Sequence, residues 1–284
     1  MMLRLRVLSA VALIPVVLFV VGLGGVWLAL LVALAAGIAL DEAYHLFSVA
    51  GHRPVRWAGF LGAFLLILAA TFLPLGEGIG AAAAGAVLVT LIGQLLRRDR
   101  GGALTDWALT LAGALYVAWC LAHFLLLRQM GQPDFAPPFW EALGAPVLGA
   151  GAWWVYATFL MVWLCDTAAY FVGMYWGRHK MAPYVSPKKS WEGAAAGFVV
   201  SIGVAVGLVP LLGLPLSYAW AALLGALVGV VGQVGDLAES LLKRQAGVKD
   251  SGRLIPGHGG MLDRADSLLF VVPVVYYFLR VVLR

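Results

Sequence analysis

Residues 264–282 read RADSLLFVVPVVYYFLRVV, and this apolar run near the end of the chain decides the fold class. A helix needs about 20 predominantly apolar residues to cross the hydrocarbon core of a membrane, and this run has that length. Eight more runs of similar length precede it, near residues 7–23, 26–48, 57–75, 79–96, 103–127, 149–175, 193–213 and 217–241. The sequence therefore predicts an all-α, polytopic integral membrane protein with about nine transmembrane helices.

The composition excludes a soluble globular domain. Of the 284 residues, 63% are hydrophobic and 12% are charged, and the mean hydropathy is +0.95. So few charged side chains could not cover the surface of a soluble protein of this length. The net charge of +5 comes from basic residues in short loops, so it indicates a membrane orientation, and no nucleic-acid partner is expected. Cys120 and Cys165 lie in apolar runs and are interpreted as small buried residues.

Positive charge alternates from loop to loop. One side of the predicted membrane collects 16 of the 19 Lys and Arg residues, within residues 4–6, 53–56, 97–100, 178–189 and 243–264. Because Lys and Arg are enriched in cytoplasmic loops, the N-terminus is expected in the cytoplasm and the C-terminus outside, in the inner or plasma membrane. A signal peptide is an alternative interpretation of the first run, since Arg4 and Arg6 precede it, but the orientation would be the same.

Polar residues inside the apolar runs divide the chain into two regions. Residues 1–145, with the first five runs, carry few acidic residues or histidines inside these runs, namely Asp41, Glu42, His45, Asp106 and His123. These lie near run ends and are interpreted as solvated at the membrane interface. Residues 146–284, with the last four runs, hold carboxylates at greater depth. We therefore expect an N-terminal membrane region and a C-terminal membrane region that carries the functional site.

A dense polar segment, SLLKRQAGVKDSGRLIPGHGGMLDRADS at residues 240–267, lies between the last two runs. In the run before it, Asp236 and Glu239 are three positions apart, and Ser240 and Lys243 follow at offsets that place all four on one face of a helix. Two carboxylates at this spacing can share a divalent cation. A solvated helix end is the alternative, but it explains Asp236 poorly because this residue lies about 10 Å inside the helix end.

The end of the polar segment repeats this pattern. Asp263 and Asp266 are three positions apart at the start of the last run, directly after the glycine-rich turn PGHGG at 256–260. Acidic residues are common at helix N-termini, which is the simpler interpretation. A glycine-rich turn that opens a helix also exposes N–H donors to an anion. His258 is either a phosphate donor, an acid–base group or a turn residue, and without a nearby Cys or second His it does not indicate zinc.

Two further places combine polar side chains with an apolar run. Asp166 lies about 16 Å inside the end of its run, where a carboxylate must face a polar cavity or a partner. The second place is SPKKSWEG at 186–193, in which two Lys, two hydroxyls and a Glu precede a predicted helix start. This composition is typical of a phosphate contact, although two Lys residues also satisfy the positive-inside rule.

Together these residues predict phosphate chemistry that depends on a metal ion. Carboxylate ligands without Cys or His favour Mg²⁺, which binds a few carboxylates together with water and phosphates. Nearby Lys and Arg side chains favour a polyphosphate, and carboxylates close to the cytoplasmic surface favour a lipid headgroup. Phosphoryl or nucleotidyl transfer needs little more than such positioning and charge neutralisation.

Several of these motifs resemble those of one known family. SLLKR (240–244), KD (249–250), PGHGG (256–260) and DRADS (263–267) closely resemble the signature of the phosphatidate cytidylyltransferase, or CDP-diacylglycerol synthase, family, and DTAAY (166–170) and SPKKSWEG (186–193) resemble two further blocks of it. Ser190 stands where Thr is more usual. The resemblance is specific over residues 160–270, and before that only the hydrophobic character agrees.

The resemblance implies an enzyme that makes CDP-diacylglycerol and pyrophosphate from CTP and phosphatidate, with Mg²⁺, at the cytoplasmic face. It implies Asp236, Glu239, Asp263 and Asp266 as metal ligands. It implies as catalytic residues Asp236, Lys243, Arg244, Lys249, Asp250, His258, Asp263 and Arg264, and as substrate-binding residues Asp166, Ser186, Lys188, Lys189, Ser190, Glu192, Ser240, Gly259 and Gly260. A second cation, monovalent or divalent, and a homodimer are left open.

Two alternatives remain. A CTP-dependent polyprenol kinase would use similar metal chemistry on a lipid alcohol, but it needs a base for the hydroxyl. An ion-coupled transporter would use Asp166 and Asp236 as cation sites, but it predicts polar groups along a path through the membrane, whereas here they cluster on one side. We expect Asp263→Asn to abolish CDP-lipid formation and to leave the fold intact.

Overall fold

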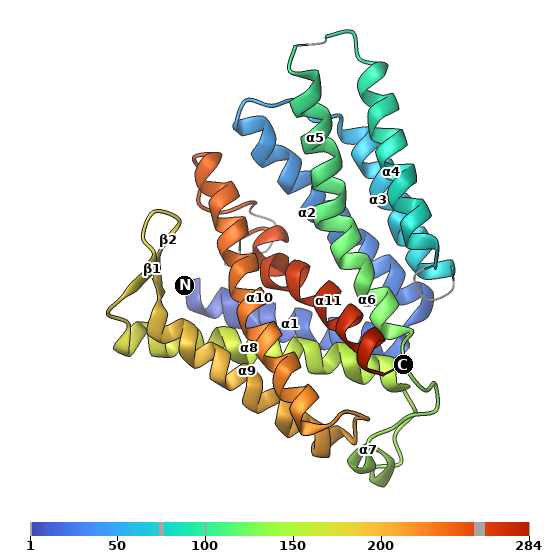
Figure 1. Cartoon of the computed structure of the whole chain (residues 1–284), viewed down its shortest axis with the longest axis vertical. Helices are drawn as coiled ribbons and strands as arrows, with labels where there is room; N and C mark the ends of the chain where they lie inside the picture. Colours follow the sequence, from blue (N-terminus) through green and yellow to red (C-terminus); the bar gives the residue numbers. More distant parts are fainter. Residues whose placement is uncertain (1, 74–76, 100, 253–258, 284) are drawn as a thin grey trace. The chain divides into compact units, whose positions relative to one another are not determined.

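The structure is a computed structural model that describes residues 2–73, 77–99, 101–252 and 259–283 (Figure 1). Within these residues the chain is almost entirely helical. The first half contains α1 (Met2–Leu23), α2 (Gly25–Val49), α3 (Arg56–Phe72), α4 (Glu77–Leu95), α5 (Ala103–Ala114), the π-helical segment η2 (Leu115–Trp119) and α6 (Cys120–Arg128). The second half contains α7 (Pro138–Ala142), α8 (Ala150–Trp176), β1 (Lys180–Ala182), β2 (Ser186–Ser190), α9 (Trp191–Leu212), α10 (Tyr218–Gln245) and α11 (Leu262–Val282).

The prediction of a polytopic, helical membrane protein is confirmed. Among the described residues, seven helical stretches are long and apolar enough to cross a membrane, namely Gly25–Val49, Gly78–Leu95, Ala103–Arg128, Ala150–Trp176, Trp191–Leu212, Tyr218–Gln245 and Leu262–Val282. The other two predicted spans coincide with shorter apolar helices, Val11–Leu23 and Arg56–Phe72. The 17 residues of α3 are about 26 Å long, somewhat less than the roughly 30 Å of a typical hydrocarbon core.

The chain packs as two compact units. The first unit holds residues 1–126 and 242–265, and the second holds residues 127–241 and 266–284. Because the unit boundaries fall inside α10 and α11, each of these helices contributes residues to both units. The first unit thus combines the N-terminal helices with most of the polar segment. The division at residue 145 predicted from the sequence follows the distribution of carboxylates and stays a prediction.

In the first unit, the side chain of Tyr44 fixes α2 against its neighbours. Tyr44 is fully buried, and its hydroxyl donates a hydrogen bond of 2.7 Å to the carbonyl of Thr110 in α5. Gly113 lies against the ring, where a Cβ would come within 2.5 Å of it. Since Glu42 lies two residues before Tyr44, this packing also holds Glu42 in place. Figure 1 shows α3 and α4 side by side, and Gly62 of α3 faces Ala86 of α4.

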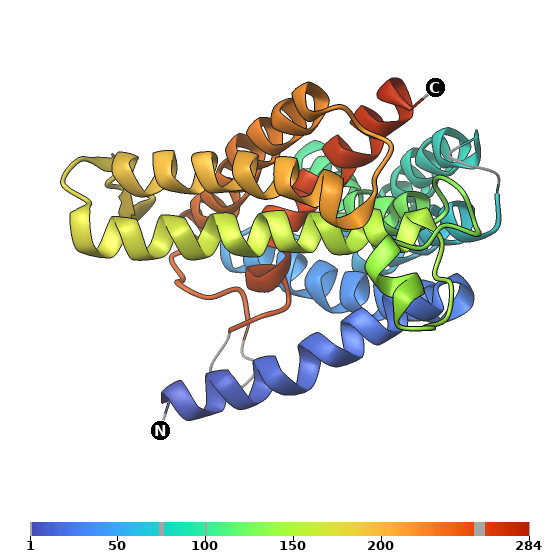
Figure 2. The ribbon, with the colours of Figure 1, turned by 90° about the horizontal axis from the view of Figure 1, so that it is seen from below.

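In the second unit, α8 and α9 run side by side, as both Figure 1 and Figure 2 show. Two glycines of α9 permit this approach, because a Cβ on Gly193 would lie 2.5 Å from the carbonyl oxygen of Ala169, and one on Gly197 would lie 2.9 Å from that of Cys165. The connection between the helices is an antiparallel hairpin of β1 and β2. The sequence did not predict these two short strands. The described part of the chain is therefore helical apart from one hairpin.

Three polar residues of the first half are not solvated, contrary to the interpretation of the sequence. Glu42 is 9% exposed, Asp106 is 4% exposed and His123 is fully buried. Asp106 accepts hydrogen bonds from the backbone N–H of Arg53 (2.8 Å) and from the guanidinium of Arg97 (3.0 Å). Local partners therefore replace water at these positions. Asp41 and His45 are exposed, as expected.

Candidate active site

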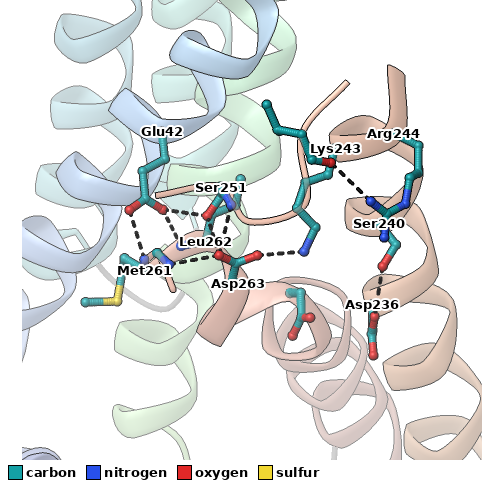
Figure 3. A network of polar contacts seen from close by, with 12 residues as sticks. Glu42, Asp236, Ser240, Lys243, Arg244, Ser251, Met261, Leu262 and Asp263 are labelled. Carbon is teal, nitrogen blue, oxygen red and sulfur yellow. Dashed lines mark hydrogen bonds and ion pairs between the residues drawn. The ribbon is translucent and has the colours of Figure 1, made fainter. Parts of the chain in front are cut away.

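One cluster of polar side chains lies in the first unit and is centred on Asp263, in the first turn of α11 (Figure 3). Its Oδ1 accepts a hydrogen bond of 2.6 Å from Nζ of Lys243, at the end of α10. Its Oδ2 accepts bonds from the backbone N–H groups of Ser251 (2.9 Å) and Gly260 (2.8 Å) and lies 3.0 Å from Oγ of Ser251. Asp263 and Lys243 are each 9% exposed. They form a buried ion pair with extra hydrogen bonds, which is the arrangement that a buried charge requires.

A second carboxylate, that of Glu42 from α2, belongs to the same cluster (Figure 3). It accepts hydrogen bonds from Oγ of Ser251 (2.9 Å) and from the backbone N–H groups of Met261 (3.1 Å) and Leu262 (2.8 Å). These N–H groups open α11, so Glu42 caps a helix that is more than 200 residues away in the sequence. We call this set the Asp263 cluster; its members are Glu42, Lys243, Ser251, Gly260, Met261, Leu262 and Asp263.

The backbone N–H groups at the start of α11 donate to carboxylates of this chain, and binding of an external anion by the glycine-rich turn stays a prediction. The donors of Gly260, Met261 and Leu262 all bond to Asp263 or Glu42. Gly259 has a left-handed φ of +81°, and a Cβ there would lie 2.7 Å from Oδ2 of Asp263. The turn thus positions side chains of the site. His258, predicted as catalytic, lies outside the described residues.

A second cluster lies in the second unit, where the hairpin meets α10. Nζ of Lys189 in β2 pairs with Oδ2 of Asp236 at 2.8 Å and lies 3.4 Å from the carbonyl oxygen of Gln233. Ser240 donates to Oδ1 of Asp236 at 3.3 Å. The Lys189 and Asp236 side chains are 23% and 34% exposed, so this pair is open to solvent. It joins Lys189 of the SPKKSWEG motif to Asp236 and Ser240 of α10, and we call it the Asp236 cluster (Lys189, Asp236 and Ser240).

Two predicted substrate-binding residues have structural partners instead. Ser190 caps α9 by accepting a hydrogen bond of 3.2 Å from the N–H of Gly193. Glu192 accepts from the backbone N–H of His179 (3.2 Å) and lies 2.6 Å from Nδ1 of its ring. Both contacts stabilise the junction between the hairpin and α9. Phosphate binding by these two side chains stays a prediction.

The remaining predicted residues are mostly near the surface. Arg244 is a basic residue in the last turn of α10, and it donates a hydrogen bond of 3.3 Å to the carbonyl of Val248. Asp266 accepts from the N–H of Ser267 at 2.6 Å, and Glu239 is buried. Ser186 is half-buried, and the exposed residues among them include Asp166, Lys188, Lys249, Asp250 and Arg264.

The binding of Mg²⁺ by Asp236, Glu239, Asp263 and Asp266 stays a prediction. In the part of the chain that the structure describes, no three His, Cys, Asp or Glu side chains lie together as a metal site. The donor chemistry nevertheless fits a hard cation, because carboxylate oxygens of Asp236 and Asp263 each bind an ammonium group, at 2.8 and 2.6 Å. These are positions where positive charge is stabilised.

Sequence reasoning missed Glu42 and Ser251 as parts of the site. Glu42 was visible as a carboxylate next to Asp41 in an otherwise apolar run, but it was assigned to the membrane interface. The structure also places a cavity of about 500 Å³ beside them, lined by Gly37, Ile38, Asp41, Glu42 and His45 of α2 together with Ser251 and Gly252. The N-terminal region therefore contributes directly to the candidate site.

The fold and these clusters define the class: a multi-pass helical membrane protein with two polar clusters, each of which pairs a Lys side chain with a carboxylate. The family model described as "Cytidylyltransferase family" matches residues 4–282, and the chain belongs to this family. It is 33% identical to a phosphatidate cytidylyltransferase of Synechocystis sp., over 98% of this chain and 97% of the relative. It is 33% identical to proteins of the same name from Bacillus subtilis (96% of each chain) and Brucella suis (97% of this chain, 93% of the relative). The resemblance therefore extends over the first half as well.

Proposed function

We propose that this protein is a phosphatidate cytidylyltransferase, which makes CDP-diacylglycerol and pyrophosphate from CTP and phosphatidate. The observation that carries the proposal is the similarity over nearly the full chain to relatives of that name. The two clusters supply suitable groups, because Lys side chains held beside carboxylates can bind phosphates and cations.

The proposed reaction is a nucleotidyl transfer in one displacement. A phosphate oxygen of phosphatidate forms a bond to the α-phosphorus of CTP, the bond from that phosphorus to the bridging oxygen breaks, and pyrophosphate leaves with the electron pair. No covalent intermediate with the protein is needed. A phosphate monoester is already largely ionised near neutral pH, so a strong general base such as His258 is not required.

The basic residues have the role of neutralising phosphate charge. Lys243 and Lys189 are held by Asp263 and Asp236, so their ammonium groups are oriented before substrate binds. The side chains of Lys188, Lys249 and Arg264 are exposed, and their positive charge suits a nucleotide or lipid phosphate. Arg244, Asp250, Asp166, Ser186, Ser240 and Gly259 remain proposed site residues on the basis of the family motifs.

We further propose Mg²⁺ as the cofactor, held by Asp236 and Asp263, with Glu239 and Asp266 as additional ligands. When bound, Mg²⁺ would neutralise charge on the transferred phosphate and on pyrophosphate. In Asp263, Oδ2 already accepts from two backbone N–H groups, so Oδ1, which now binds Lys243, is the oxygen that would face a cation. A second cation and a homodimer stay predictions.

The proposed topology has nine spans, the N-terminus in the cytoplasm and the C-terminus outside. The support is the alternation of Lys and Arg between loops and the coincidence of all nine apolar runs with helices. This orientation puts the polar segment and the hairpin on the cytoplasmic side of the inner or plasma membrane, where CTP is available.

Neither the described residues nor the relatives named above support the polyprenol kinase or the ion-coupled transporter. The deciding experiment supplies the purified protein with CTP labelled at the α-phosphate, Mg²⁺ and either phosphatidate or a polyprenol. The proposal expects label in a CDP-lipid and release of pyrophosphate with phosphatidate only. Phosphorylation of the polyprenol, which transfers the γ-phosphate, or no reaction with phosphatidate would overturn it.

A further inference from the structure

Glu42 is the one carboxylate of α2 that the structure buries in the Asp263 cluster, and the proposed reaction gives it no role. We propose that Glu42 is a positioning residue: through Ser251 and the first N–H groups of α11 it holds Asp263, and with it Lys243, in one orientation. This inference rests on the proposed function, because it assigns Asp263 and Lys243 to the active site.

The hydrogen-bond arrangement shows how Glu42 acts through Ser251. Oγ of Ser251 lies 2.9 Å from Oε2 of Glu42 and 3.0 Å from Oδ2 of Asp263. A hydroxyl has a single proton, so Ser251 can donate to only one of these carboxylates at a time. Asp263 keeps two backbone donors on the same oxygen in either case. The Ser251 proton can therefore bond to Glu42, which fixes the Ser251 side chain while its N–H holds Asp263.

Glu42 also fixes the start of the helix that carries Asp263. Its two carboxylate oxygens accept from the N–H groups of Met261 (3.1 Å) and Leu262 (2.8 Å), directly before Asp263. N–H groups at a helix start have no partner within the helix, and a negative charge there is favourable. With α2 fixed through Tyr44, Glu42 sets the position of the first turn of α11.

The glycines around Glu42 show that the fit is close. A Cβ on Gly252 would overlap Oε1 of Glu42, and a Cβ on Gly260 would overlap Oε2 of Glu42 and Oγ of Ser251. Both glycines have ordinary backbone angles, because neither has a positive φ. Their small size is therefore required by the contact with Glu42 and not by backbone conformation. The backbone at Gly252 and Gly260 thus lies against Glu42 with no room for a side chain between them.

The decisive variant is Glu42→Gln, which keeps the size of the side chain but removes the charge and places an amide N–H₂ next to N–H donors. We expect kcat to fall by about 10- to 100-fold, the usual effect of losing a residue that orients a site group. The KM values for CTP and phosphatidate should change little, because the proposed role of Glu42 is to position Asp263 and not to bind substrate. Glu42→Asp, which keeps the charge, should retain more activity than Glu42→Gln. Glu141→Gln, the same change at an exposed glutamate of α7 that belongs to neither cluster, is the matched control and should keep the wild-type kcat.

Hydrogen exchange gives a readout that does not depend on activity. In Glu42→Gln, the amides of residues 260–263 should exchange faster than in the wild type, while those of α3 and α8 stay unchanged. Ser251→Ala should give a smaller loss of kcat, and adding it to Glu42→Gln should cost less than the sum of the two effects, since both act on Asp263. If Glu42→Gln does not fold, Ser251→Ala alone decides, and normal kcat in that variant would overturn the inference.

The outcomes separate this inference from the proposed function. Wild-type protein that makes no CDP-lipid refutes the proposed function, while the exchange of residues 260–263 still tests whether Glu42 positions Asp263. Active wild-type protein together with a Glu42→Gln variant of unchanged kcat refutes the positioning role alone. Faster exchange throughout the protein would also refute it, because that result describes general destabilisation.

Discussion

Asp263 and Asp236 are both paired with Lys, but they differ in burial, and this difference decides which one is the better probe of catalysis. Asp263 is 9% exposed and accepts from Lys243, Ser251 and Gly260, so Asp263→Asn weakens the packing of the Asp263 cluster as well as any chemistry. The expectation that this variant leaves the fold intact is therefore replaced by an expected loss of stability. Asp236 is 34% exposed, and its pair contributes little to folding.

The first prediction follows from this contrast. Asp236→Asn should lower the rate of CDP-lipid formation by about 100-fold or more. The variant loses the carboxylate that pairs with Lys189 and that is a proposed metal ligand. Its free energy of unfolding should stay within about 1 kcal/mol of the wild type, since the pair is partly solvated. Both values are measurable on one preparation, by the labelled-CTP assay and by unfolding in detergent followed by circular dichroism. Full activity in this variant would remove Asp236 from the proposed site.

The second prediction separates the stability of the buried pair from its chemistry. Lys243→Met leaves the Asp263 carboxylate buried without its cation and should destabilise the protein by about 3–5 kcal/mol. Adding Asp263→Asn removes the buried charge and retains an oxygen that can accept from Gly260 and Ser251, so most of the lost stability should return. Both variants should be inactive. A double variant no more stable than Lys243→Met would show that the charge of Asp263 is not the source of the loss.

At the level of residues, the sequence predicts the local part of the site well. Asp236 and Ser240 are four positions apart on one helix, and Asp263 follows the predicted glycine-rich turn. The spacing of motifs could not pair Lys189 with Asp236 or place Glu42 beside Leu262, because those contacts join helices far apart in the sequence. Only tertiary packing determines such pairs. The burial of Glu42 could not be predicted for the same reason, since the hydrogen-bond donors that replace water around its carboxylate come from the other end of the chain.

At the level of elements, the apolar runs predict helices because their backbone groups must be satisfied within the membrane. The β1–β2 hairpin was not predictable in the same way. Its strands have three and five residues, and the sequence SPKKS has neither a clear alternation nor strong β-propensity. The hairpin forms between the ends of α8 and α9, whose close packing brings its strands together.

The third prediction tests that packing. Gly193→Ala in α9 would place a Cβ 2.5 Å from the carbonyl of Ala169 and should destabilise the protein by about 1–3 kcal/mol. Gly203→Ala, in the same helix, meets nothing within 4 Å and should be neutral or stabilising by up to about 1 kcal/mol. Thermal unfolding of the two variants in one detergent makes the comparison. Equal effects would mean that α8 and α9 do not pack through Gly193.

At the level of the whole molecule, the fourth prediction concerns orientation. The alternation of Lys and Arg places the loops that contain Arg98 and Lys249 in the cytoplasm and the loop that contains Asp134 outside. Single cysteines introduced at these three positions, in a chain whose Cys120 and Cys165 are replaced by Ala, report the side through a maleimide that does not cross membranes. Cells should label position 134 directly and positions 98 and 249 only after permeabilisation. Because α3 is shorter than the other spans, a further pair of single cysteines at positions 53 and 77, which flank it, tests whether it crosses. If α3 crosses, position 77 should label directly and position 53 only after permeabilisation, whereas labelling of both from the same side would show that α3 lies in the interface.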